Sequence, residues 1–212
     1  MDKIVTLIPA RGGSKGIPRK NLLDIHGRPM IYYTIKASLN SIVDETWVSS
    51  EDEEILKISE SYNAYTIKRP DELSTDNSSS ESVLFHFAEN VDFDILVFVQ
   101  ATSPLIISDD LNKGIEMMRN YDSVLSVTTC LPFIWMANGT AKYDYNHRKR
   151  RQELENLYLE TGGFFITTRK NLDKFKNRIG GRIGLCIVPK IRSFDVDTHE
   201  DLEIVKKLLK TT

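Results

Sequence analysis

Four cationic side chains lie close together near the start of the chain, in a loop that also holds three glycines. The cations are Arg11, Lys15, Arg19 and Lys20, and the glycines are Gly12, Gly13 and Gly16. Glycines let a backbone approach a ligand closely, and successive N–H groups in such a turn form a concavity that binds anions. The loop therefore predicts a polyphosphate site. The alternative is a solvated basic surface loop, because runs of charge are usually solvated.

The spacing in this loop differs from the two commonest phosphate-binding loops. The P-loop pattern Gly-x4-Gly-Lys-Ser/Thr is absent, and so is the dinucleotide pattern Gly-x-Gly-x-x-Gly. No helix is expected to start inside the loop. The residues immediately before it, Ile4 to Ile8, form an almost wholly apolar run that suits a buried strand. We therefore expect the site at the carboxyl end of a parallel strand, where open α/β sheets bind ligands.

Two carboxylates near the other end of the chain form a second candidate site. Asp195 and Asp197 alternate along an extended segment, so both side chains are expected on one side. Two like charges so close are costly without a cation between them, and oxygen ligands together with nucleotide phosphates suit Mg²⁺. The alternative is that Asp197 caps the last helix and Asp195 lies on the surface. His199 is expected at the surface, in the first turn of that helix, rather than as a ligand.

Two polar segments are expected near the same edge of the sheet. Residues 74–82 are mostly serine and precede apolar residues at helical spacing, so free N–H groups and hydroxyls there suit a phosphate or a sugar. Alternatively, one serine caps the helix and the others have no role. Gln100 and Thr102 lie at the carboxyl end of the clearest buried strand, 94–100, where polar groups commonly bind ligands. A buried glutamine can also merely bond the neighbouring backbone.

The elements that must position these residues alternate along the chain. Strands are predicted at 45–50, 64–68 and 123–130, and helices at 27–39, 50–62 and 109–118, with Ser50 and Ser108 as caps. Further on, strands are predicted at 160–166 and 184–189, with a short helix at 171–175 and a last helix ending at Lys210. The order implies an α/β fold of Rossmann-like type, with a mostly parallel sheet in the middle of three layers.

Residues 131–158 interrupt this alternation. The segment holds Asn138-Gly139, a strong hairpin signal, together with several aromatic residues and the basic run 147–151. We expect an arm inserted into a single domain of residues 1–212, and its aromatic residues indicate an interface. The basic run suits a solvated face, contacts to an anionic substrate, or a nucleic-acid patch. The last is the weakest interpretation because the chain is acidic overall.

Composition sets the class of protein. The chain has 212 residues, 41% of them hydrophobic, which fits one α/β domain with a sizeable core. Its formal net charge is −2, so we expect neither a nucleic acid nor a membrane as partner. Cys130 and Cys186 lie far apart in apolar runs, which favours a reducing cytoplasm over a disulfide framework. No signal peptide is recognised, and no apolar run approaches the ~18 residues of a membrane helix.

The residues Pro9 to Leu22 resemble the opening signature of the acylneuraminate cytidylyltransferases, which activate sialic acids and related nonulosonic acids. The order Ala-Arg-x-x-Ser-Lys-Gly-x-Pro-x-Lys-Asn is long and specific. Later segments resemble further motifs of that family in the same order: Glu-Leu-Ser-Thr-Asp-Asn-Ser-Ser-Ser, Leu-Val-Phe-Val-Gln-Ala-Thr-Ser-Pro-Leu, Arg-Arg-Gln-Glu-Leu and Asp-Val-Asp-Thr-x-Glu-Asp-Leu. Agreement of this many motifs in sequence is not expected by chance.

The resemblance implies an enzyme that joins CTP to a nine-carbon α-keto acid sugar, giving a CMP-sugar and pyrophosphate. It assigns the triphosphate to Arg11, Lys15 and Lys20, and the rest of the nucleotide to Ala10, Gly12, Asn21 and Ser80. It assigns the sugar acid to Gln100, Thr102, Arg151 and Phe165. Asp195 and Asp197 would bind Mg²⁺, and with Arg11 and Lys20 they form the expected catalytic set. The family is typically dimeric, so Arg151 on the arm is expected to reach the partner's site.

Three departures from the family pattern lie near the sugar side. Residues 161–165 stand where the family commonly has Asn-Gly-Ala-Ile-Tyr, Leu185-Cys186 replaces paired aromatics, and the connection from Pro189 to Asp195 is short. We therefore hypothesise that the sugar is a bacterial relative such as legionaminic acid and not necessarily N-acetylneuraminic acid.

The sequence leaves open two other functions and the identity of the group that accepts the proton. The nearest alternatives are a nucleotidyltransferase of the same fold acting on an eight-carbon keto-deoxy sugar or a sugar phosphate, and a non-catalytic nucleotide-binding module. The first loop disfavours the former, and the intact sets of cations and aspartates disfavour the latter. No histidine stands out as a base, so an aspartate, a water on the metal or the substrate's own carboxylate would take the proton.

Overall fold

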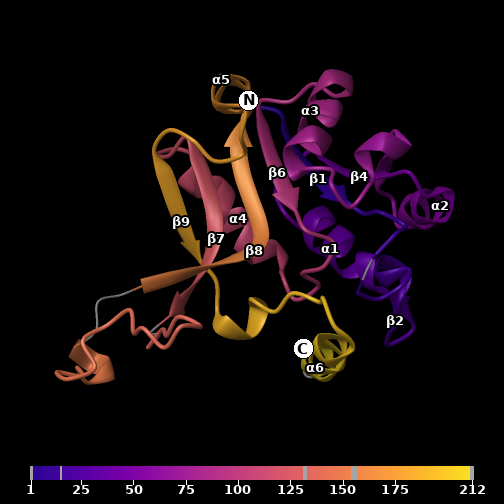
Figure 1. The fold of residues 1–212 in the computed structure, drawn as a ribbon. Coiled ribbons are helices and arrows are strands. Elements are labelled where there is room, and N and C mark those ends of the chain that lie inside the picture. The colour runs from indigo at the N-terminus through magenta and orange to yellow at the C-terminus, as the bar shows by residue number, and fades with distance from the viewer. Residues whose placement is uncertain (1, 15, 131–132, 154–156, 211–212) are drawn as a thin grey trace.

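The computed structural model describes residues 2–14, 16–130, 133–153 and 157–210, apart from the side chain of Arg151. Within these residues, a seven-stranded sheet in the order β5-β4-β1-β6-β8-β7-β9 runs through the middle of the molecule (Figure 1). Its strands are β1 (Ile4–Pro9), β4 (Glu45–Ser50), β5 (Tyr65–Lys68), β6 (Ile95–Val99), β7 (Ser123–Cys130), β8 (Leu157–Thr168) and β9 (Ile183–Ile187). The strands pair in parallel, except that β8 lies antiparallel between β6 and β7. The predicted mostly parallel α/β sheet is confirmed.

Helices cover both faces of this sheet. One face packs against α1 (Met30–Leu39), α2 (Glu53–Ser61) and α4 (Ser108–Met117), and the other against α3 (Ser80–Asn90) and α5 (Arg169–Phe175). Because successive strand residues point to opposite faces, Leu7 and Ile8 of β1 enter different core clusters, as do Val97 and Phe98 of β6. All of β6 is buried, which explains why its sequence is a continuous apolar run.

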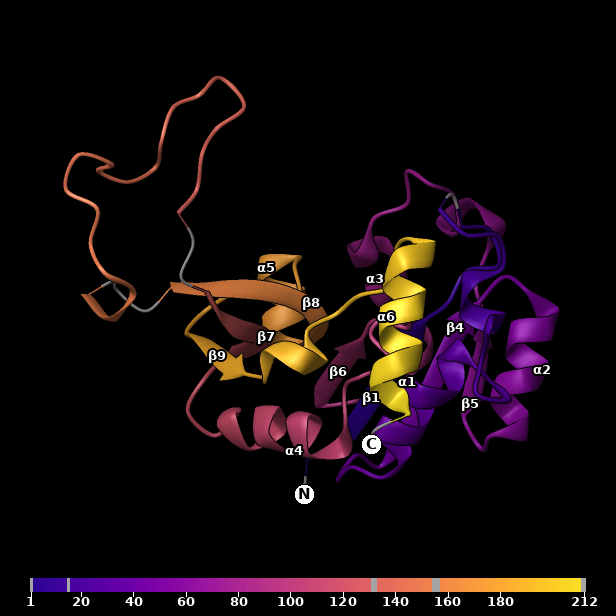
Figure 2. The same cartoon turned by 90° about the horizontal axis from the view of Figure 1, so that it is seen from below.

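A third apolar cluster lies at the carboxyl edge of the parallel strands. Leu202 and Val205 of α6 (His199–Leu209) pack there with Ile17, Leu105 and Val196. The helix α6 crosses in front of the sheet rather than joining either helical layer (Figure 2). The cluster therefore brings three segments together at one edge: the first loop, the loop after β6 and the segment around Asp195.

Several element starts differ from the prediction. Ser50 is the last residue of β4, and the cap of α2 is Asp52, whose carboxylate accepts from the N–H groups of Glu54 and Ile55 at 2.9 and 3.2 Å. Ser108 is the first residue of α4 and makes no capping bond. Neighbouring polar residues are near-equal caps, so pattern alone could not choose between them.

The sequence did not predict the short elements before the first helix and in the loops. The predicted helix from residue 27 begins at Met30, because the preceding residues form the small hairpin of β2 (Asp24–Ile25) and β3 (Arg28–Pro29). The remaining elements are short 3-10 turns: η1 (Lys20–Leu22), η2 (Asp71–Leu73), η3 (Arg151–Glu153) and η4 (Lys190–Arg192). The helix α5 also begins two residues before the predicted start.

Residues 133–153 project beyond the end of β7 and β8, as an arm would (Figure 2). The predicted turn at Asn138-Gly139 is confirmed, since Gly139 has a φ of 82° and its N–H donates to Met136 at 2.9 Å. A bridge joins Trp135 to Ala141 beside this turn. The predicted end of the arm at residue 158 is wrong, because Leu157 and Tyr158 already pair with β7 as part of β8.

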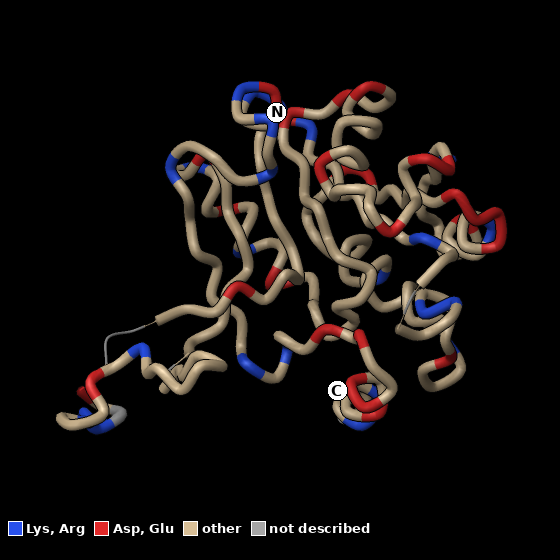
Figure 3. Tube along the Cα trace, in the orientation of Figure 1, with Lys and Arg blue, Asp and Glu red and all other residues tan. Residues whose placement is uncertain are grey.

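Charges of both signs are spread over the surface, with acidic residues gathered around α2 (Figure 3). Arg148 of the basic run lies over the ring of Phe133, 4.1 Å from its centre. In the part of the chain that the structure describes, no helix has both the length and the apolar character needed to cross a bilayer.

The packing of α4 on the sheet gives a test of the fold. A Cβ atom added at Gly114 would lie 2.7 Å from Ile166 and 2.8 Å from Phe164, so Gly114→Ala should destabilise the chain by about 1–3 kcal/mol despite the better helix propensity of alanine. Gly13→Ala is the control, because a Cβ at Gly13 meets nothing within 4 Å. Thermal unfolding measures both. A melting temperature for Gly114→Ala at or above that of the unchanged chain would contradict this packing.

Candidate active site

A cavity of about 460 Å³ opens at the carboxyl ends of β1 and β6. Its walls come from the first loop, from residues 69–83 and from residues 98–102, and Asp197 adds a wall from the other end of the chain. Among the predicted site residues, the cavity collects Arg11, Lys20, Asn21, Ser80, Gln100, Thr102 and Asp197. The sequence thus identified residues from four distant segments that line one cavity, but it did not give the distances between them.

Lys20 connects the first loop to the segment that carries the aspartates. Its ammonium donates to the carbonyl oxygen of Val196 at 2.6 Å and to the Asp197 carboxylate at 2.9 Å. The Lys20 side chain is only 11% exposed, and a buried ammonium needs such partners to offset its lost hydration. Gly16 lies at the same contact, since a Cβ there would lie 2.5 Å from the carbonyl oxygen of Asp197. A side chain at position 16 would therefore push these two segments apart.

Arg11 and Asn21 shape the opposite side of the first loop. The Arg11 guanidinium pairs with Asp76, which also lines the cavity, at 2.7 Å, and the Asn21 side-chain amide donates to the Arg11 carbonyl at 3.0 Å. Asn21 is 4% exposed, and its side-chain oxygen has no hydrogen-bond partner among the described residues. A buried acceptor without a partner costs free energy, so this oxygen is available to a donor on a ligand.

The two aspartates lie in different surroundings. Asp195 is half-buried and accepts from the Ser103 hydroxyl at 3.2 Å, whereas the Asp197 side chain is 74% exposed. Burial raises the pKa of Asp195 and the charge of Asp197 adds to this, which outweighs the lowering by Thr102, Lys20 and Ser103. The alternative role of Asp197 as a helix cap is wrong, because Thr198 caps α6 by accepting from the Asp201 N–H at 3.2 Å.

These carboxylates suit a magnesium ion bound together with a nucleotide. They flank the buried Val196, whose N–H is fixed by the Thr102 carbonyl at 2.9 Å, so the segment that carries them is well anchored. Their mutual repulsion is the kind of strain that a cation relieves. No cluster of three or more metal-ligating side chains occurs among the described residues. Mg²⁺ in nucleotide sites commonly takes one or two carboxylates and completes its shell with phosphates and water.

Two predicted nucleotide contacts are used within the protein instead. Ala10 is 1% exposed and its N–H donates to the Ser49 carbonyl at 2.9 Å. The N–H of Gly12 donates to Glu51 at 2.7 Å, so that donor does not face the cavity. The glycine is nevertheless required at this position, since a Cβ would lie 2.3 Å from the Asp52 carboxylate.

The structure also does not place Phe165 where it could make the predicted contact with the sugar. Phe165 is 2% exposed in the core beside Phe98, its partner on β6, and it is Phe98 that lines the cavity. With no hydroxyl, the ring at position 165 packs like any other core phenylalanine. Lys15 and the side chain of Arg151 lie outside the described residues, so their predicted roles stay predictions.

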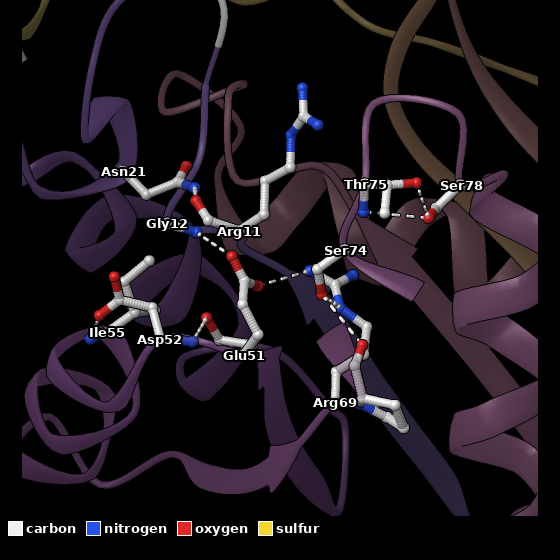
Figure 4. A network of polar contacts seen from close by, with 12 residues as sticks. Arg11, Gly12, Asn21, Glu51, Asp52, Ile55, Arg69, Ser74, Thr75 and Ser78 are labelled. Atoms are coloured by element: carbon white, nitrogen blue, oxygen red, sulfur yellow. Dashed lines mark hydrogen bonds and ion pairs between the residues drawn. The ribbon is translucent and has the colours of Figure 1, made fainter. Parts of the chain in front are cut away.

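Sequence reasoning missed Arg69, a buried cation on the cavity wall (Figure 4). Arg69 is 4% exposed, donates to the Ser74 hydroxyl at 2.9 Å and lies 3.4 Å from the Glu51 carboxylate. Burial lowers the pKa of Arg69, while the charge of Glu51 opposes that shift. A signal was present, because Arg69 directly follows a predicted strand and so falls at the carboxyl edge of the sheet.

Comparison with known proteins gives matches along most of the chain. The family model described as Cytidylyltransferase matches residues 5–211. The pseudaminic acid cytidylyltransferase of Campylobacter jejuni is 35% identical over 224 residues, which cover 98% of this chain and 97% of that protein. The N-acylneuraminate cytidylyltransferase B of Danio rerio is 32% identical, over 95% of this chain and 50% of its own length, and that of Escherichia coli is 30% identical, over 95% and 51%. The chain thus spans about half the length of these acylneuraminate relatives.

Solved structures agree on the fold. A CMP:2-keto-3-deoxy-manno-octonic acid synthetase in complex with CTP matches with a TM-score of 0.78 over 99% of both chains, at 21% identity. A 4-diphosphocytidyl-2C-methyl-D-erythritol synthase from Anaerococcus prevotii matches with a TM-score of 0.74 over 99% of both chains, at 14% identity. At such identities the likeness concerns the arrangement of the elements.

The raised pKa of Asp195 gives a test of the site. A carboxyl whose pKa is raised by folding contributes stability that is present below about pH 3.9, its ordinary value, and is lost as the pH rises through the raised pKa. Asp195→Asn should therefore raise the melting temperature at pH 7 in the absence of Mg²⁺, by a few degrees for each kcal/mol gained, and the gain should vanish near pH 3.9.

The exposed neighbour provides the control for that measurement. Asp197→Asn should bring no gain in melting temperature, because little burial is relieved and the contact with Lys20 is weakened. An Asp195→Asn variant that melts below the unchanged chain at pH 7 would show that the Ser103 and Thr102 hydrogen bonds outweigh the cost of burial.

Proposed function

The chain belongs to the cytidylyltransferase family, and we propose that it transfers CMP from CTP to the anomeric hydroxyl of a nonulosonic acid, releasing pyrophosphate. The observation that carries this proposal is the cavity at the carboxyl edge, where Arg11, Lys20 and Asp197 come together from both ends of the chain. Cations on one wall and a carboxylate pair beside them suit a triphosphate with its metal ion.

The nucleotide would lie along the first loop. Its phosphates would pair with Arg11 and Lys20. They would replace Asp76 and Asp197, which are the partners of these cations in the structure. The hydroxyl and N–H groups at the start of α3, where Ser79 is the cap and Ser80 the first residue, would hold another part of the nucleotide. Positive charge at one end and small polar groups at the other support an extended ligand of this kind.

The sugar acid would approach from Gln100 and Thr102, at the end of β6. Its anomeric hydroxyl attacks the α-phosphorus and gives its proton to an aspartate, to water or to the sugar's own carboxylate. The bond from that phosphorus to the bridging oxygen breaks, so that pyrophosphate leaves with the electron pair. There is little covalent work for the protein, so its contribution is to orient the two substrates and to offset charge on pyrophosphate through Arg11 and Lys20. Asp195 and Asp197 would hold Mg²⁺, which when bound neutralises charge on the phosphoryl oxygens.

We propose that the sugar is legionaminic acid or a related bacterial nonulosonic acid. The relative that matches over nearly the full length of both chains is, by its name, a pseudaminic acid enzyme of a bacterium. The sequence departs from the family pattern at residues 161–165 and at Leu185-Cys186, which supports a sugar other than N-acetylneuraminic acid, although these residues do not line the cavity. We also propose a cytoplasmic location, which the free thiols of Cys130 and Cys186 support.

A homodimer is part of the same proposal. The edge strand β9 turns Ile183, Leu185 and Ile187 outward, each of them at least 40% exposed. Leu157 and Leu159, at the start of β8, are also exposed. An apolar surface of this kind beside the projecting arm supports contact with a second copy of the chain. In such a dimer, Arg151 would contact the sugar acid in the partner's cavity.

The reaction is tested by pyrophosphate release with CTP, Mg²⁺ and a panel of nonulosonic acids that includes N-acetylneuraminic, legionaminic and pseudaminic acid. We expect turnover with CTP and a bacterial sugar, and a loss of about a hundredfold in Asp197→Ala, equivalent to about 3 kcal/mol of transition-state stabilisation. Glu203→Ala, an exposed carboxylate on α6, is the control and should keep full activity.

Two other outcomes would change this proposal. A clear preference for N-acetylneuraminic acid would refute the assignment of the sugar but keep the reaction. Turnover only with an eight-carbon keto-deoxy sugar or with a sugar phosphate would replace the reaction by that of another nucleotidyltransferase of the same fold.

The homodimer is tested by the mass of the chain in solution. Leu185→Lys would place a charge in the middle of the apolar surface on β9, so we expect a dimer to become a monomer, as measured by sedimentation. Lys57→Ala, exposed on α2 at the opposite edge of the sheet, is the control. A monomeric unchanged chain would contradict the proposed dimer directly.

A further inference from the structure

The acidic residues that follow β4 bind the first loop. Glu51 accepts the N–H of Gly12 at 2.7 Å, and the Arg19 guanidinium pairs with Asp52 at 2.8 Å and with Glu54 at 2.6 Å. Arg19 adopts the left-handed backbone conformation with a φ of 53°, which is uncommon for a residue other than glycine. The shape of the first loop is therefore imposed by contacts with the start of α2.

Glu51 also reaches the opposite wall of the cavity. Its second carboxylate oxygen lies 3.4 Å from the guanidinium of Arg69, which in turn donates to Ser74 (Figure 4). Gly12 belongs to the first loop, whereas Arg69 and Ser74 begin the segment that leads to α3. One carboxylate thus touches both segments between which the phosphates of a nucleotide would lie.

The positive charge of the buried Arg69 requires an anion at position 51. Arg69 is almost completely buried, and a buried guanidinium is tolerated only beside an anion. Burial alone would raise the pKa of Glu51, but hydrogen bonds from backbone N–H groups and from Ser74, together with the charge of Arg69, hold that pKa below its ordinary value. Glu51 is therefore ionised at neutral pH and, together with Ser74, holds the guanidinium of Arg69 in place on the cavity wall.

We propose that Glu51 is a positioning residue for the nucleotide, which sets the spacing between the first loop and Arg69. The inference rests on the proposed function, because the nucleoside triphosphate is the ligand whose fit it would control. Among the described residues, the Glu51 carboxylate contacts the first loop, Arg69 and Ser74, and it does not contact Gln100 or Thr102 on the expected sugar side. The loss of its charge should thus weaken the binding of CTP and leave the sugar unaffected.

The experiment compares Glu51→Gln with Glu53→Gln in steady-state kinetics and in calorimetric titration with CTP. Glu53 does not line the cavity, is 62% exposed and pairs with Lys68 at the surface, so its variant is a matched change of charge. For Glu51→Gln we expect KM and Kd for CTP to rise about tenfold or more, as for loss of a charged hydrogen bond. KM for the sugar should stay within about twofold, and Glu53→Gln should match the unchanged chain in both.

Two further variants separate positioning from general stability. Glu51→Asp keeps the charge and should bind CTP more tightly than Glu51→Gln. If Glu51→Gln folds poorly, CTP binding by Glu51→Asp still tests the role of the charge. If Glu51 acts through Arg69, the effect of Glu51→Gln should shrink in an Arg69→Gln background. A lower melting temperature with unchanged KM and Kd for CTP, or wild-type behaviour throughout, would overturn this inference alone. Absence of CTP binding by the unchanged chain would refute the proposed function and the inference with it.

Discussion

The contact of Lys20 with Val196 and Asp197 is the interaction on which the site depends. It joins residues 176 and 177 positions apart in the sequence, at distances of 2.6 and 2.9 Å. The apolar cluster beneath it, with Ile17, Val196 and Val205, holds the same two segments together. Apolar packing does not fix the distance and orientation between them. Hydrogen bonds from a nearly buried ammonium supply that directional component. Without them, Asp197 would not be held at the cavity that the cations of the first loop line.

The same pairing of cations with carboxylates recurs around the cavity wall. Arg11 faces Asp76, Arg69 faces Glu51, and Lys20 faces Asp197. A group of unpaired cations converging on one cavity would repel one another and destabilise the fold. Each partner carboxylate lowers that repulsion, and those near the opening can give way to phosphates, which carry more charge. The cavity can therefore be stable as it stands and still bind a polyanion.

Much of the fold follows from local pattern, and most of the site follows only from tertiary contacts. The strands β1 and β6 are nearly continuous apolar runs, and Trp47-Val48 indicates β4, so the existence of these strands was predictable. The antiparallel placement of β8 between β6 and β7 was not, because an apolar run carries no information about the direction of its neighbours. Asp52 and Ser50 differ little as caps, which is why the start of α2 was misjudged.

The site residues divide in the same way. Arg11, Lys20 and Asp197 are recognisable because charge and glycine gather locally around them, and the family resemblance placed Asn21 and Ser80 with them. The only signal for Arg69 was its place directly after a predicted strand, and Glu51 had none, since their roles arise from contacts between residues 69–74 and the first loop. Phe165 was assigned to the sugar from the family pattern, but a ring without a hydroxyl is more stable in the core, where the structure places it.

The most direct test of this account is amide hydrogen exchange of the chain with and without CTP and Mg²⁺. Binding at the cavity predicts protection in three places: the first loop with η1, the segment 69–80, and the segment around Asp195 and Asp197. Peptides from α5 and β9, far from the cavity, should exchange as before. No protection by CTP, or protection confined to elements away from the carboxyl edge of β1 and β6, would contradict the account.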